Sequence, residues 1–437
     1  MKFKTLLIIL DGLGDLPSQK LGMKTPLEKA YTPNMDYLAS IGMNGIMDPI
    51  APGIAPGSDV AHLAIFGYDP HREYPGRGPF EAEGYGIELT GHEIALRANF
   101  ATVTQKDGKL IVTDRRAGRI TKPLTSELAK AVNEALEREG LNVEFIPTVE
   151  HRGVLIIKGG GLSPEITDTD PHVTGAPVLL SRPLAHAKNP DAASKTAQIL
   201  NKFTLISYKV LKEHPINKKL AEGGKPQANV ILARGAGSKA HIETFEARWN
   251  LKAACIAAGP LYRGIGRVLG MTMIDVPGAT ALPKSNFKGK IKSAINALDE
   301  HDFVYVHIKG TDVSSHKKNP VEKAEVLEKV DEAMEELKEV ARESYVVVTG
   351  DHSTPCKLGV HSGDPVPILI AGPLVRVDKV KRFSELDALH GSLGRIRGRD
   401  LMNILIGLME RNVEYGARLE PMEVRVMPKS WVPLRVS

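Results

Sequence analysis

Aspartate and histidine residues follow three short apolar segments that lie far apart along the chain. The segments span residues 5–10, 303–308 and 345–349. The acidic and imidazole side chains that come shortly after them are Asp11, Asp312, His316, Asp351, His352 and His361. In an open parallel sheet, ligands bind outside the carboxyl ends of the strands. If the three segments are strands of one such sheet, these side chains converge on one crevice.

A shared metal site explains this pattern better than six separate structural roles. A single Asp after a strand is usually a helix cap or a turn residue. Three carboxylates and three imidazoles at one end of a sheet, however, would be costly to bury without a cation. Mixed carboxylate and imidazole ligands suit Mn²⁺, Zn²⁺, Co²⁺ or Fe²⁺ better than Ca²⁺. The sequence therefore predicts a divalent-metal site.

Ser58 is the candidate nucleophile. It follows Pro56-Gly57 and begins a short helical pattern, where free backbone amides and the helix dipole favour an anion. The local sequence taken alone favours an N-cap serine over a nucleophile. A neighbouring metal would favour nucleophilic chemistry, because a bound cation lowers the pKa of the oxygen that it ligates.

Short apolar strands alternate with amphipathic helices in the two terminal parts of the chain. This alternation predicts an α/β fold with a doubly wound, mostly parallel sheet. The expected strands are 5–10, 229–233, 253–258, 271–276, 303–308, 345–349 and 366–371. The clearest expected helices are 321–340 and 395–409.

The middle of the chain has strand and helix signals of its own. The expected strands are 98–103, 110–112, 143–149 and 154–158, and the expected helices are 126–138 and 192–211. We therefore expect residues 73–224 to form a smaller, inserted α+β domain that binds substrate. Residues 1–72 and 225–437 would form the metal-binding catalytic domain, because their Asp and His residues need one another.

Composition excludes several classes of protein. The chain has 437 residues and a net charge of +5, without a dense Lys/Arg run, which argues against nucleic acid as a partner. No apolar stretch approaches the length of a membrane span. Two cysteines, Cys255 and Cys356, provide no disulfide framework and indicate a reducing cytoplasm.

Together these motifs resemble those of a known family. Asp11-Gly12, Pro56-Gly-Ser58, Asp312-x-x-x-His316, Asp351-His352 and His361 are similar to the metal and nucleophile set of the alkaline phosphatase superfamily. Within it, the chain most resembles the archaeal-type branch of the cofactor-independent phosphoglycerate mutases. The resemblance covers residues 1–80 and 230–405 and includes the segments 278–280, 309–312 and 394–402.

The resemblance implies two divalent cations and no bisphosphoglycerate cofactor. Mn²⁺ is the expected metal, with Zn²⁺, Co²⁺ and Mg²⁺ as alternatives. Asp312, His316 and His361 would hold one cation. The other would be held by Asp11, Asp351, His352 and the oxygen of Ser58.

The implied reaction is the interconversion of 3-phosphoglycerate and 2-phosphoglycerate in glycolysis and gluconeogenesis, through a phosphoserine at Ser58. The partner would be a small phosphorylated hydroxy acid. The candidate substrate-binding residues are Asp114, Arg115, Arg119, His151, Arg234, Arg263 and Lys309. Each arginine taken alone is more typical of a solvated surface charge, except that Arg115 and Arg119 fit a binding role equally well, because charges and a glycine cluster there beside a strand end. Guanidinium pairing with a carboxylate or phosphate is the reason to consider them.

Two alternatives use the same scaffold: a metal-dependent phosphomonoesterase or phosphodiesterase, and a mutase for another phosphorylated substrate. A third, a non-catalytic metal-binding or ligand-binding protein, is disfavoured because all seven expected ligand positions are present.

Overall fold

The apolar segment Thr5–Leu10 forms strand β1, whose six residues are all buried. It lies between β10 (Phe303–Ile308) and β11 (Tyr345–Thr349) and runs parallel to both. Continuous apolar runs of this kind are typical of strands that are covered on both faces. The computed structural model describes residues 3–239, 242–420, 426–428, 432 and 434.

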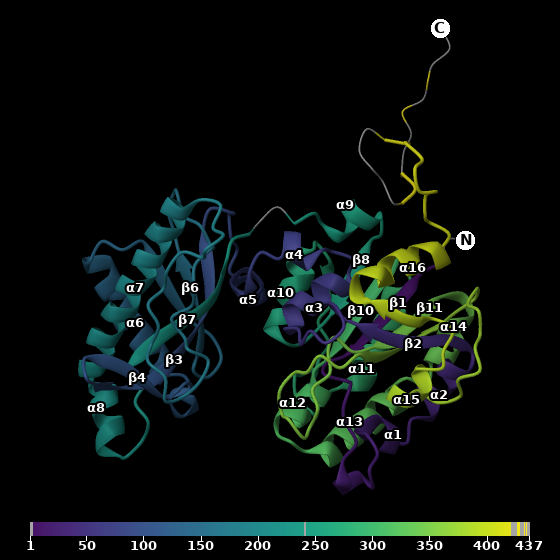
Figure 1. Cartoon of the computed structure of the whole chain (residues 1–437), viewed down its shortest axis with the longest axis horizontal. Coiled ribbons are helices and arrows are strands. Elements are labelled where there is room, and N and C mark those ends of the chain that lie inside the picture. The colour runs from purple at the N-terminus through teal and green to yellow at the C-terminus, as the bar shows by residue number, and fades with distance from the viewer. Residues whose placement is uncertain (1–2, 240–241, 421–425, 429–431, 433, 435–437) are drawn as a thin grey trace. The chain divides into compact units, whose positions relative to one another are not determined.

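The chain divides into two compact units, Met1–Tyr74 with Glu243–Ser437, and Pro75–Ile242 (Figure 1). The first unit holds an eight-stranded sheet in the order β13-β2-β12-β11-β1-β10-β8-β9. Among the described residues, only β12 opposes the direction of the other strands. The expected doubly wound, mostly parallel α/β sheet is confirmed. The remaining strands are β2 (Gly42–Asp48), β8 (Ala253–Ile256), β9 (Thr272–Met273), β12 (Val366–Ala371) and β13 (Gly394–Arg397).

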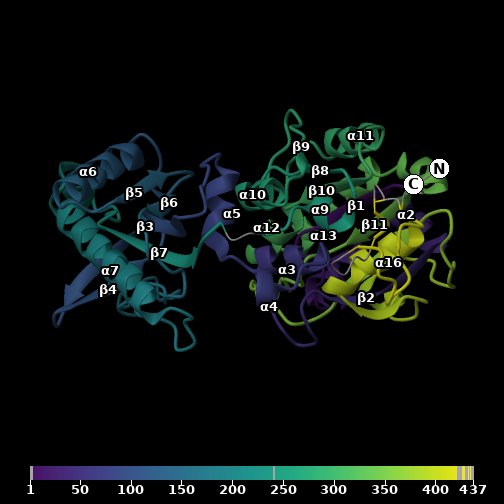
Figure 2. The ribbon, with the colours of Figure 1, turned by 90° about the horizontal axis from the view of Figure 1, so that it is seen from above.

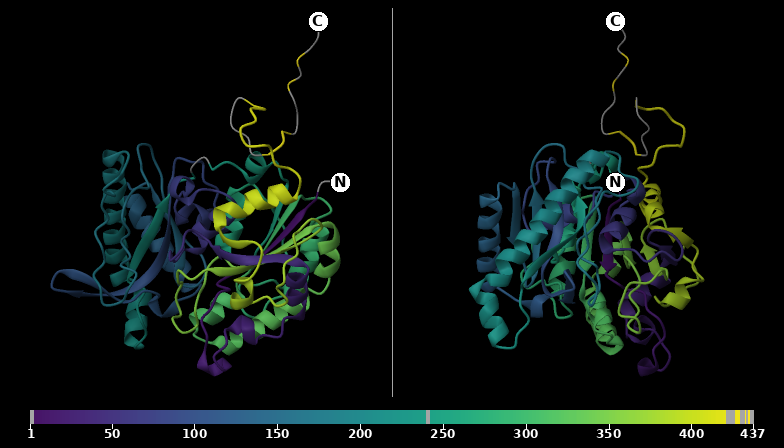
Figure 3. Two further views of the ribbon diagram at one scale, coloured as in Figure 1. Left: turned by 45° about the vertical axis from the view of Figure 1, so that its right-hand side comes forward. Right: turned by 60° about the vertical axis from the view of Figure 1, so that its left-hand side comes forward.

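Helices cover both faces of this sheet, as the left panel of Figure 3 shows for the yellow helix at residues 401–408 and the green helices of residues 320–343. The first face packs against α1 (Pro26–Lys29), α2 (Pro33–Ser40), α11 (Phe287–Ala297), α13 (Pro320–Ala333) and α14 (Leu337–Glu343). On the other face, aromatic rings meet edge to face: the ring of Phe66, which ends α3 (Ser58–Ile65), lies 5.0 Å from that of Tyr305. The other helices of this unit are α4 (Pro70–Glu73), α9 (Phe245–Trp249), α10 (Pro260–Val268), α12 (Gly310–His316), α15 (Glu385–Ala388) and α16 (Leu401–Leu408).

Two expected helices are shorter than the sequence pattern indicates. The helix expected over 321–340 is divided by a turn at residues 334–336, so that Leu337 and Ala341 of α14 are buried beside α2 and β11. The helix expected over 395–409 begins only at Leu401. Residues 394–397 form β13, where the guanidinium of Arg395 binds both carboxylate oxygens of Asp48 on β2, at 2.6 and 2.9 Å, and residues 398–400 form a 3-10 turn.

The second unit is an antiparallel sheet with helices packed on it (Figure 2). Its strands are β3 (Ile94–Lys106), β4 (Lys109–Asp114), β5 (Val143–Pro147), β6 (Arg152–Ile157) and β7 (Val230–Gly237). Its helices are α5 (Arg77–Gly84), α6 (Leu124–Arg138), α7 (Pro190–Glu213) and α8 (Pro215–Glu222). Apolar residues of α6 and α7, among them Leu128, Val132, Leu200 and Phe203, form one core with the sheet.

One strand was assigned to the wrong sheet by its sequence pattern. The segment expected as strand 229–233 of the catalytic sheet is β7, and it pairs antiparallel with β3 in the second unit. The 13-residue strand β3 extends past β6, and β7 covers the backbone groups along its other side. The second unit therefore reaches Ile242, beyond the expected end at residue 224.

Candidate active site

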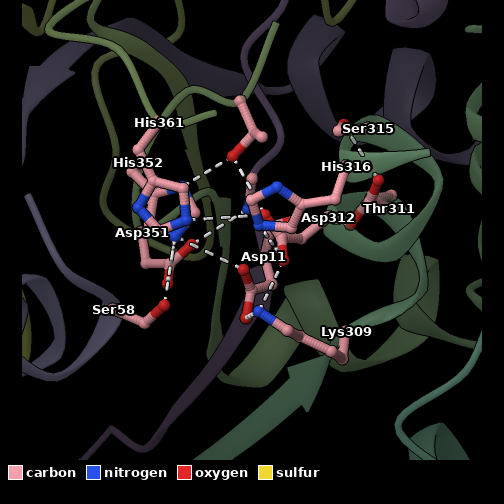
Figure 4. Close-up of polar contacts among 12 residues, drawn as sticks. Asp11, Ser58, Lys309, Thr311, Asp312, Ser315, His316, Asp351, His352 and His361 are labelled. Atoms are coloured by element: carbon pink, nitrogen blue, oxygen red, sulfur yellow. Dashed lines mark hydrogen bonds and ion pairs between the residues drawn. The ribbon is translucent and has the colours of Figure 1, made fainter. Parts of the chain in front are cut away.

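The acidic side chains that follow β1, β10 and β11 lie together (Figure 4). β1 lies between two parallel partners, so the carboxyl ends of the three strands reach the same edge of the sheet. Asp11, Asp312, Asp351 and His352 are completely buried there. Gly12 has a φ of +64°, and a Cβ on it would lie 2.7 Å from Oγ1 of Thr354, so only glycine allows the chain to pass this close to the cluster.

Ser58 is the first residue of α3, and Gly57 rather than Ser58 occupies the N-cap position. The hydrogen bond that the Ser58 hydroxyl makes among the described residues is not a capping bond. The Oγ atom of Ser58 lies 3.1 Å from Nε2 of His352. The hydroxyl is therefore directed at the cluster of acidic and imidazole groups.

Asp312, His316 and His361 form one group of ligand atoms that all lie within 4.8 Å of one another. Nε2 of His316 is 3.3 Å from Oδ2 of Asp312, and Nε2 of His361 is 3.8 Å from Oδ1. In both imidazoles Nδ1 donates to a backbone carbonyl, that of Gly359 or Pro56, at 2.8 Å. These bonds select the tautomer whose Nε2 lone pair faces the site, as in metal-ligating histidines.

Asp11, Asp312 and His352 form a second such group, so Asp312 belongs to both. Nε2 of His352 lies 3.4 Å from Oδ1 of Asp11 and 3.3 Å from Oδ2 of Asp351. Burial lowers the pKa of His352 well below its usual value, which keeps the imidazole neutral and able to ligate. The structure thus brings together all seven residues that the sequence predicts as metal ligands.

The charges in this cluster fit a bound divalent cation. Oδ1 of Asp11 and Oδ2 of Asp351 are buried oxygens that accept no hydrogen bond. Burial, together with the negative charge of Asp11, raises the pKa of Asp351 well above its usual value. Buried carboxylates with open oxygens are costly unless a cation is present. The residues therefore suit the two-cation site that the sequence predicts.

Lys309 is the cationic residue within this cluster. Its Nζ lies 2.9 Å from Oδ2 of Asp11 and 2.7 Å from Oδ2 of Asp312. Burial lowers the pKa of Lys309, but the surrounding acidic groups, with Asp11 the largest contributor among them, together outweigh burial, and the net direction is upward. The ammonium therefore remains charged beside the two carboxylates.

Two residues that contact Asp11 are not among those predicted from the sequence. Tyr262 donates its hydroxyl proton to Oδ2 of Asp11, and Nε2 of His307 lies 2.9 Å from the same oxygen. The rings of Tyr262 and His307 stack at 3.4 Å. With Lys309 as a third partner, Oδ2 is saturated and only Oδ1 remains open to a cation. Such partners orient metal ligands in known sites.

His62 is the third missed residue. Its Nδ1 donates to the carbonyl of Ser58 at 2.6 Å, one helical turn earlier, and burial lowers its pKa to about 4. Nδ1 also lies 3.5 Å from Oδ2 of Asp351. Its position four residues after Ser58 on the same helix was the available signal.

The candidate substrate residues of the second unit have mixed environments. Asp114 accepts the backbone N–H groups of Arg116 and Gly118, so its carboxylate holds a turn. Arg115 binds both oxygens of Asp170, at 3.0 and 2.6 Å. Nη1 of Arg234 lies 3.2 Å from Nδ1 of His172, and its buried Nε has no hydrogen-bond partner.

The remaining candidates lie in different surroundings. Arg119 is exposed, whereas His151 is buried, and burial together with nearby arginines lowers the pKa of His151 to about 4. Arg263 belongs to the first unit, where its guanidinium pairs with Asp275 at 2.5 Å. The candidate metal ligands thus lie close together in the first unit, whereas the substrate candidates lie in several different environments.

No described helix is both long enough and apolar enough to cross a membrane.

Comparison with known proteins gives consistent matches. A family model for 2,3-bisphosphoglycerate-independent phosphoglycerate mutase matches residues 39–217. Mutases of that name from Ignicoccus hospitalis and Methanocaldococcus jannaschii are 45% and 46% identical, each over 95% of this chain and all of the relative.

Solved structures agree with the sequence matches. A protein from Pyrococcus horikoshii aligns with a TM-score of 0.79 and 39% identity, over 95% of this chain and all of its own length. A cofactor-independent phosphoglycerate mutase from Thermoplasma acidophilum aligns with a TM-score of 0.66 and 38% identity, over 94% of this chain and all of its own. With relatives this similar along nearly its whole length, the chain belongs to the family of 2,3-bisphosphoglycerate-independent phosphoglycerate mutases.

Proposed function

We propose that this protein interconverts 3-phosphoglycerate and 2-phosphoglycerate, without bisphosphoglycerate, through a phosphoserine at Ser58. The proposal rests above all on one observation. The hydroxyl of Ser58 lies beside the buried imidazole of His352, among three buried carboxylates and the two more exposed imidazoles of the site, in a chain of the mutase family. We place the enzyme in the cytoplasm, in glycolysis and gluconeogenesis.

The residues divide between two cations in the proposed mechanism. Asp312, His316 and His361 would hold one, and Asp11, Asp351, His352 and Ser58 would hold the other. Two divalent ions, Mn²⁺ with Zn²⁺, Co²⁺ or Mg²⁺ as alternatives, would neutralise charge on the transferred phosphoryl group and activate the serine oxygen.

The chain's own groups prepare the nucleophile. The helix that begins at Ser58 presents free amides to the phosphoryl oxygens. His62 binds the Ser58 carbonyl and fixes the first turn of that helix. Lys309 provides a fixed positive charge beside the acidic ligands, where it can bind an oxygen of the phosphoryl group.

The proposed transfer balances in both directions. The bond between phosphorus and the C3 oxygen breaks while a bond from phosphorus to Oγ of Ser58 forms. The serine hydroxyl loses one proton and the freed C3 hydroxyl gains one. Glycerate then turns, and its C2 oxygen takes the phosphoryl group from the serine by the reverse step.

The second unit would retain glycerate during this turn. A planar guanidinium binds a carboxylate through two hydrogen bonds, and the buried Nε–H of Arg234 makes no hydrogen bond, although it lies 4.0 Å from Oδ2 of Asp170. Arg115, Arg119 and His151 are further candidates in this unit. A hydrolase does not need to retain the dephosphorylated acid, so retention is what distinguishes the proposed mutase.

Product analysis tests the proposal. The purified protein would be incubated with 3-phosphoglycerate and Mn²⁺, and the products would be followed by phosphorus NMR before and after chelation. We expect 2-phosphoglycerate and no accumulation of inorganic phosphate, with turnover lost on chelation and regained on adding Mn²⁺. Release of inorganic phosphate alone would identify a phosphatase, and a reaction unaffected by chelation would contradict the metal requirement.

A further inference from the structure

Lys323 is a fully buried lysine in α13 that does not belong to the metal-ligand cluster. Its Nζ donates to the backbone carbonyl of Gly12 at 2.8 Å and lies 2.9 Å from Oδ2 of Asp15. Longer contacts reach the carbonyls of Gly14, at 3.3 Å, and Thr354, at 3.4 Å. A buried ammonium requires several such acceptors, and here they all come from the two segments that follow β1 and β11.

Asp15 connects the same two segments from the opposite side of the ion pair. Its Oδ1 and Oδ2 atoms lie 3.0 and 3.2 Å from the backbone nitrogen of Cys356, which donates to this carboxylate. The backbone N–H of Thr354 also donates to the carbonyl of Gly14 at 3.0 Å. Because the Asp15 side chain is buried too, water does not weaken the pair.

These two segments carry ligands of the proposed second cation. Gly12 directly follows Asp11, and its N–H donates to Oδ1 of Asp351 at 3.0 Å. Oγ1 of Thr354 donates to Oδ1 of Asp312 and lies 3.0 Å from Nδ1 of His352. A change in the spacing of the segments would therefore move Asp11 relative to His352.

We propose that the Lys323–Asp15 ion pair is a positioning device that sets the distance between the Asp11 and Asp351–His352 halves of the metal site. Neither side chain ligates the metal or touches substrate. This inference rests on the proposed two-cation function and extends it to residues outside the ligand set. Its consequence is that metal affinity depends on a lysine that never contacts the metal.

A purely structural role is the alternative, and α13 contains a matched control for it. Asp331, in the same helix, is buried and accepts the backbone N–H groups of Met35 at 2.7 Å and Asn34 at 3.1 Å. These bonds join α13 to α2, and they do not involve the segments after β1 or β11. Asp331→Asn should lower stability without changing metal affinity.

The test compares metal-free wild type, Lys323→Met and Asp331→Asn by calorimetric titration with Mn²⁺, at a temperature where circular dichroism shows each to be folded. We expect Lys323→Met to weaken Mn²⁺ binding about 10- to 100-fold, the range found when groups that orient metal ligands are lost. Without metal, the amides of Thr354 and Cys356 should exchange hydrogen faster in this variant only. Asp331→Asn should bind Mn²⁺ as the wild type does.

The outcomes separate this inference from the proposed function. Wild-type protein that fails to bind Mn²⁺ would contradict the two-cation function itself. If the wild type binds Mn²⁺ and the folded Lys323→Met variant binds it with the same affinity, only the positioning role is overturned. If Lys323→Met does not fold, Asp15→Asn, which keeps the shape of the side chain, replaces it. Wild-type affinity in Asp15→Asn, or failure of that variant to fold, would likewise show the pair to be structural.

Discussion

Nε2 of His352 lies 3.1 Å from the hydroxyl oxygen of Ser58, although the two residues are 294 positions apart in the chain. The same nitrogen lies within 3.4 Å of carboxylate oxygens of Asp11 and Asp351. One imidazole therefore connects the candidate nucleophile to both acidic ligands that follow β1 and β11. This arrangement leads to the first prediction.

Replacing Ser58 by alanine should lower kcat by about ten-thousand-fold or more, since loss of an attacking oxygen removes the covalent path. The fold should remain, because Gly57 rather than Ser58 occupies the N-cap position of α3. Quenched reactions analysed by mass spectrometry should show phosphate on the peptide with Ser58 in the wild type and none in the variant.

Ser207→Ala provides the control. Ser207 is buried in the second unit, where its hydroxyl accepts the N–H of Ile231 and donates to the carbonyl of Thr204. This variant should lose some stability and retain turnover. Appreciable activity in Ser58→Ala would show that another group accepts the phosphoryl group.

Tyr262→Phe should weaken Mn²⁺ binding about 10- to 100-fold, because it removes one of the donors that hold Oδ2 of Asp11. Tyr305→Phe is a matched control. The Tyr305 hydroxyl is buried and has no hydrogen-bond partner, so its removal should leave affinity unchanged and should not lower the free energy of unfolding. Calorimetric titration with Mn²⁺ measures the affinity of both variants. If Tyr262→Phe binds Mn²⁺ as tightly as Tyr305→Phe, Tyr262 has no role in orienting Asp11.

Glu385 should make stability depend on pH. Its carboxylate accepts the Asp15 backbone N–H and the Thr25 hydroxyl, and burial raises its pKa from 4.5 to about 7. A raised pKa in the folded state means that ionisation opposes folding. The stabilising contribution of Glu385 to the free energy of unfolding is fully present below the unfolded pKa of 4.5 and is lost as pH rises through the folded pKa of about 7.

The variant Glu385→Gln removes this ionisation. Its free energy of unfolding relative to wild type should increase by about 2 kcal/mol between about pH 5 and about pH 8.5, measured by urea unfolding. For the control, in which the exposed Glu343 is replaced by glutamine, the free energy of unfolding relative to wild type should not change with pH over the same range. A flat profile for Glu385→Gln would mean that the carboxyl ionises equally in the folded and unfolded states.

Arg234→Lys should raise KM for 3-phosphoglycerate about tenfold with a smaller change in kcat, because lysine keeps the charge but loses the planar pair of donors. Arg138→Lys, at an exposed position of the same unit, should change neither constant. Steady-state kinetics at saturating Mn²⁺ gives KM and kcat for both variants. An unchanged KM in Arg234→Lys would remove this residue from the set proposed to hold glycerate.

Much of the catalytic sheet could be predicted because its strands are continuous apolar runs. β1, β10 and β11 have the bounds that their sequences predict, and the Asp and His residues after them meet as expected. β2 was missed because its sequence, with two glycines, an asparagine and an aspartate, lacks that pattern. β7 has the apolar character of a buried strand, but apolar character does not determine which sheet a strand joins.

The residues around the candidate metal ligands were harder to predict for a different reason. His307 lies within the apolar strand β10, and the sequence does not distinguish a structural histidine there from one that contacts the site. Tyr262 lies in α10, a segment that is distant in sequence from the candidate ligands. Their roles depend on which groups the fold places beside Asp11. Charge and residue type alone do not contain that information.

The pairing of β1 also affects how the protein is made. Thr5 pairs with Phe303 on one side and with Tyr345 on the other. The first strand to be translated therefore has no pairing partner until most of the chain has been synthesised. At about 5–20 residues per second, an apolar segment emerges from the ribosome some 15–60 seconds before its partners exist. During synthesis the nascent chain therefore needs shielding of its first strand, and a chain that terminates before residue 345 cannot assemble the central trio of strands.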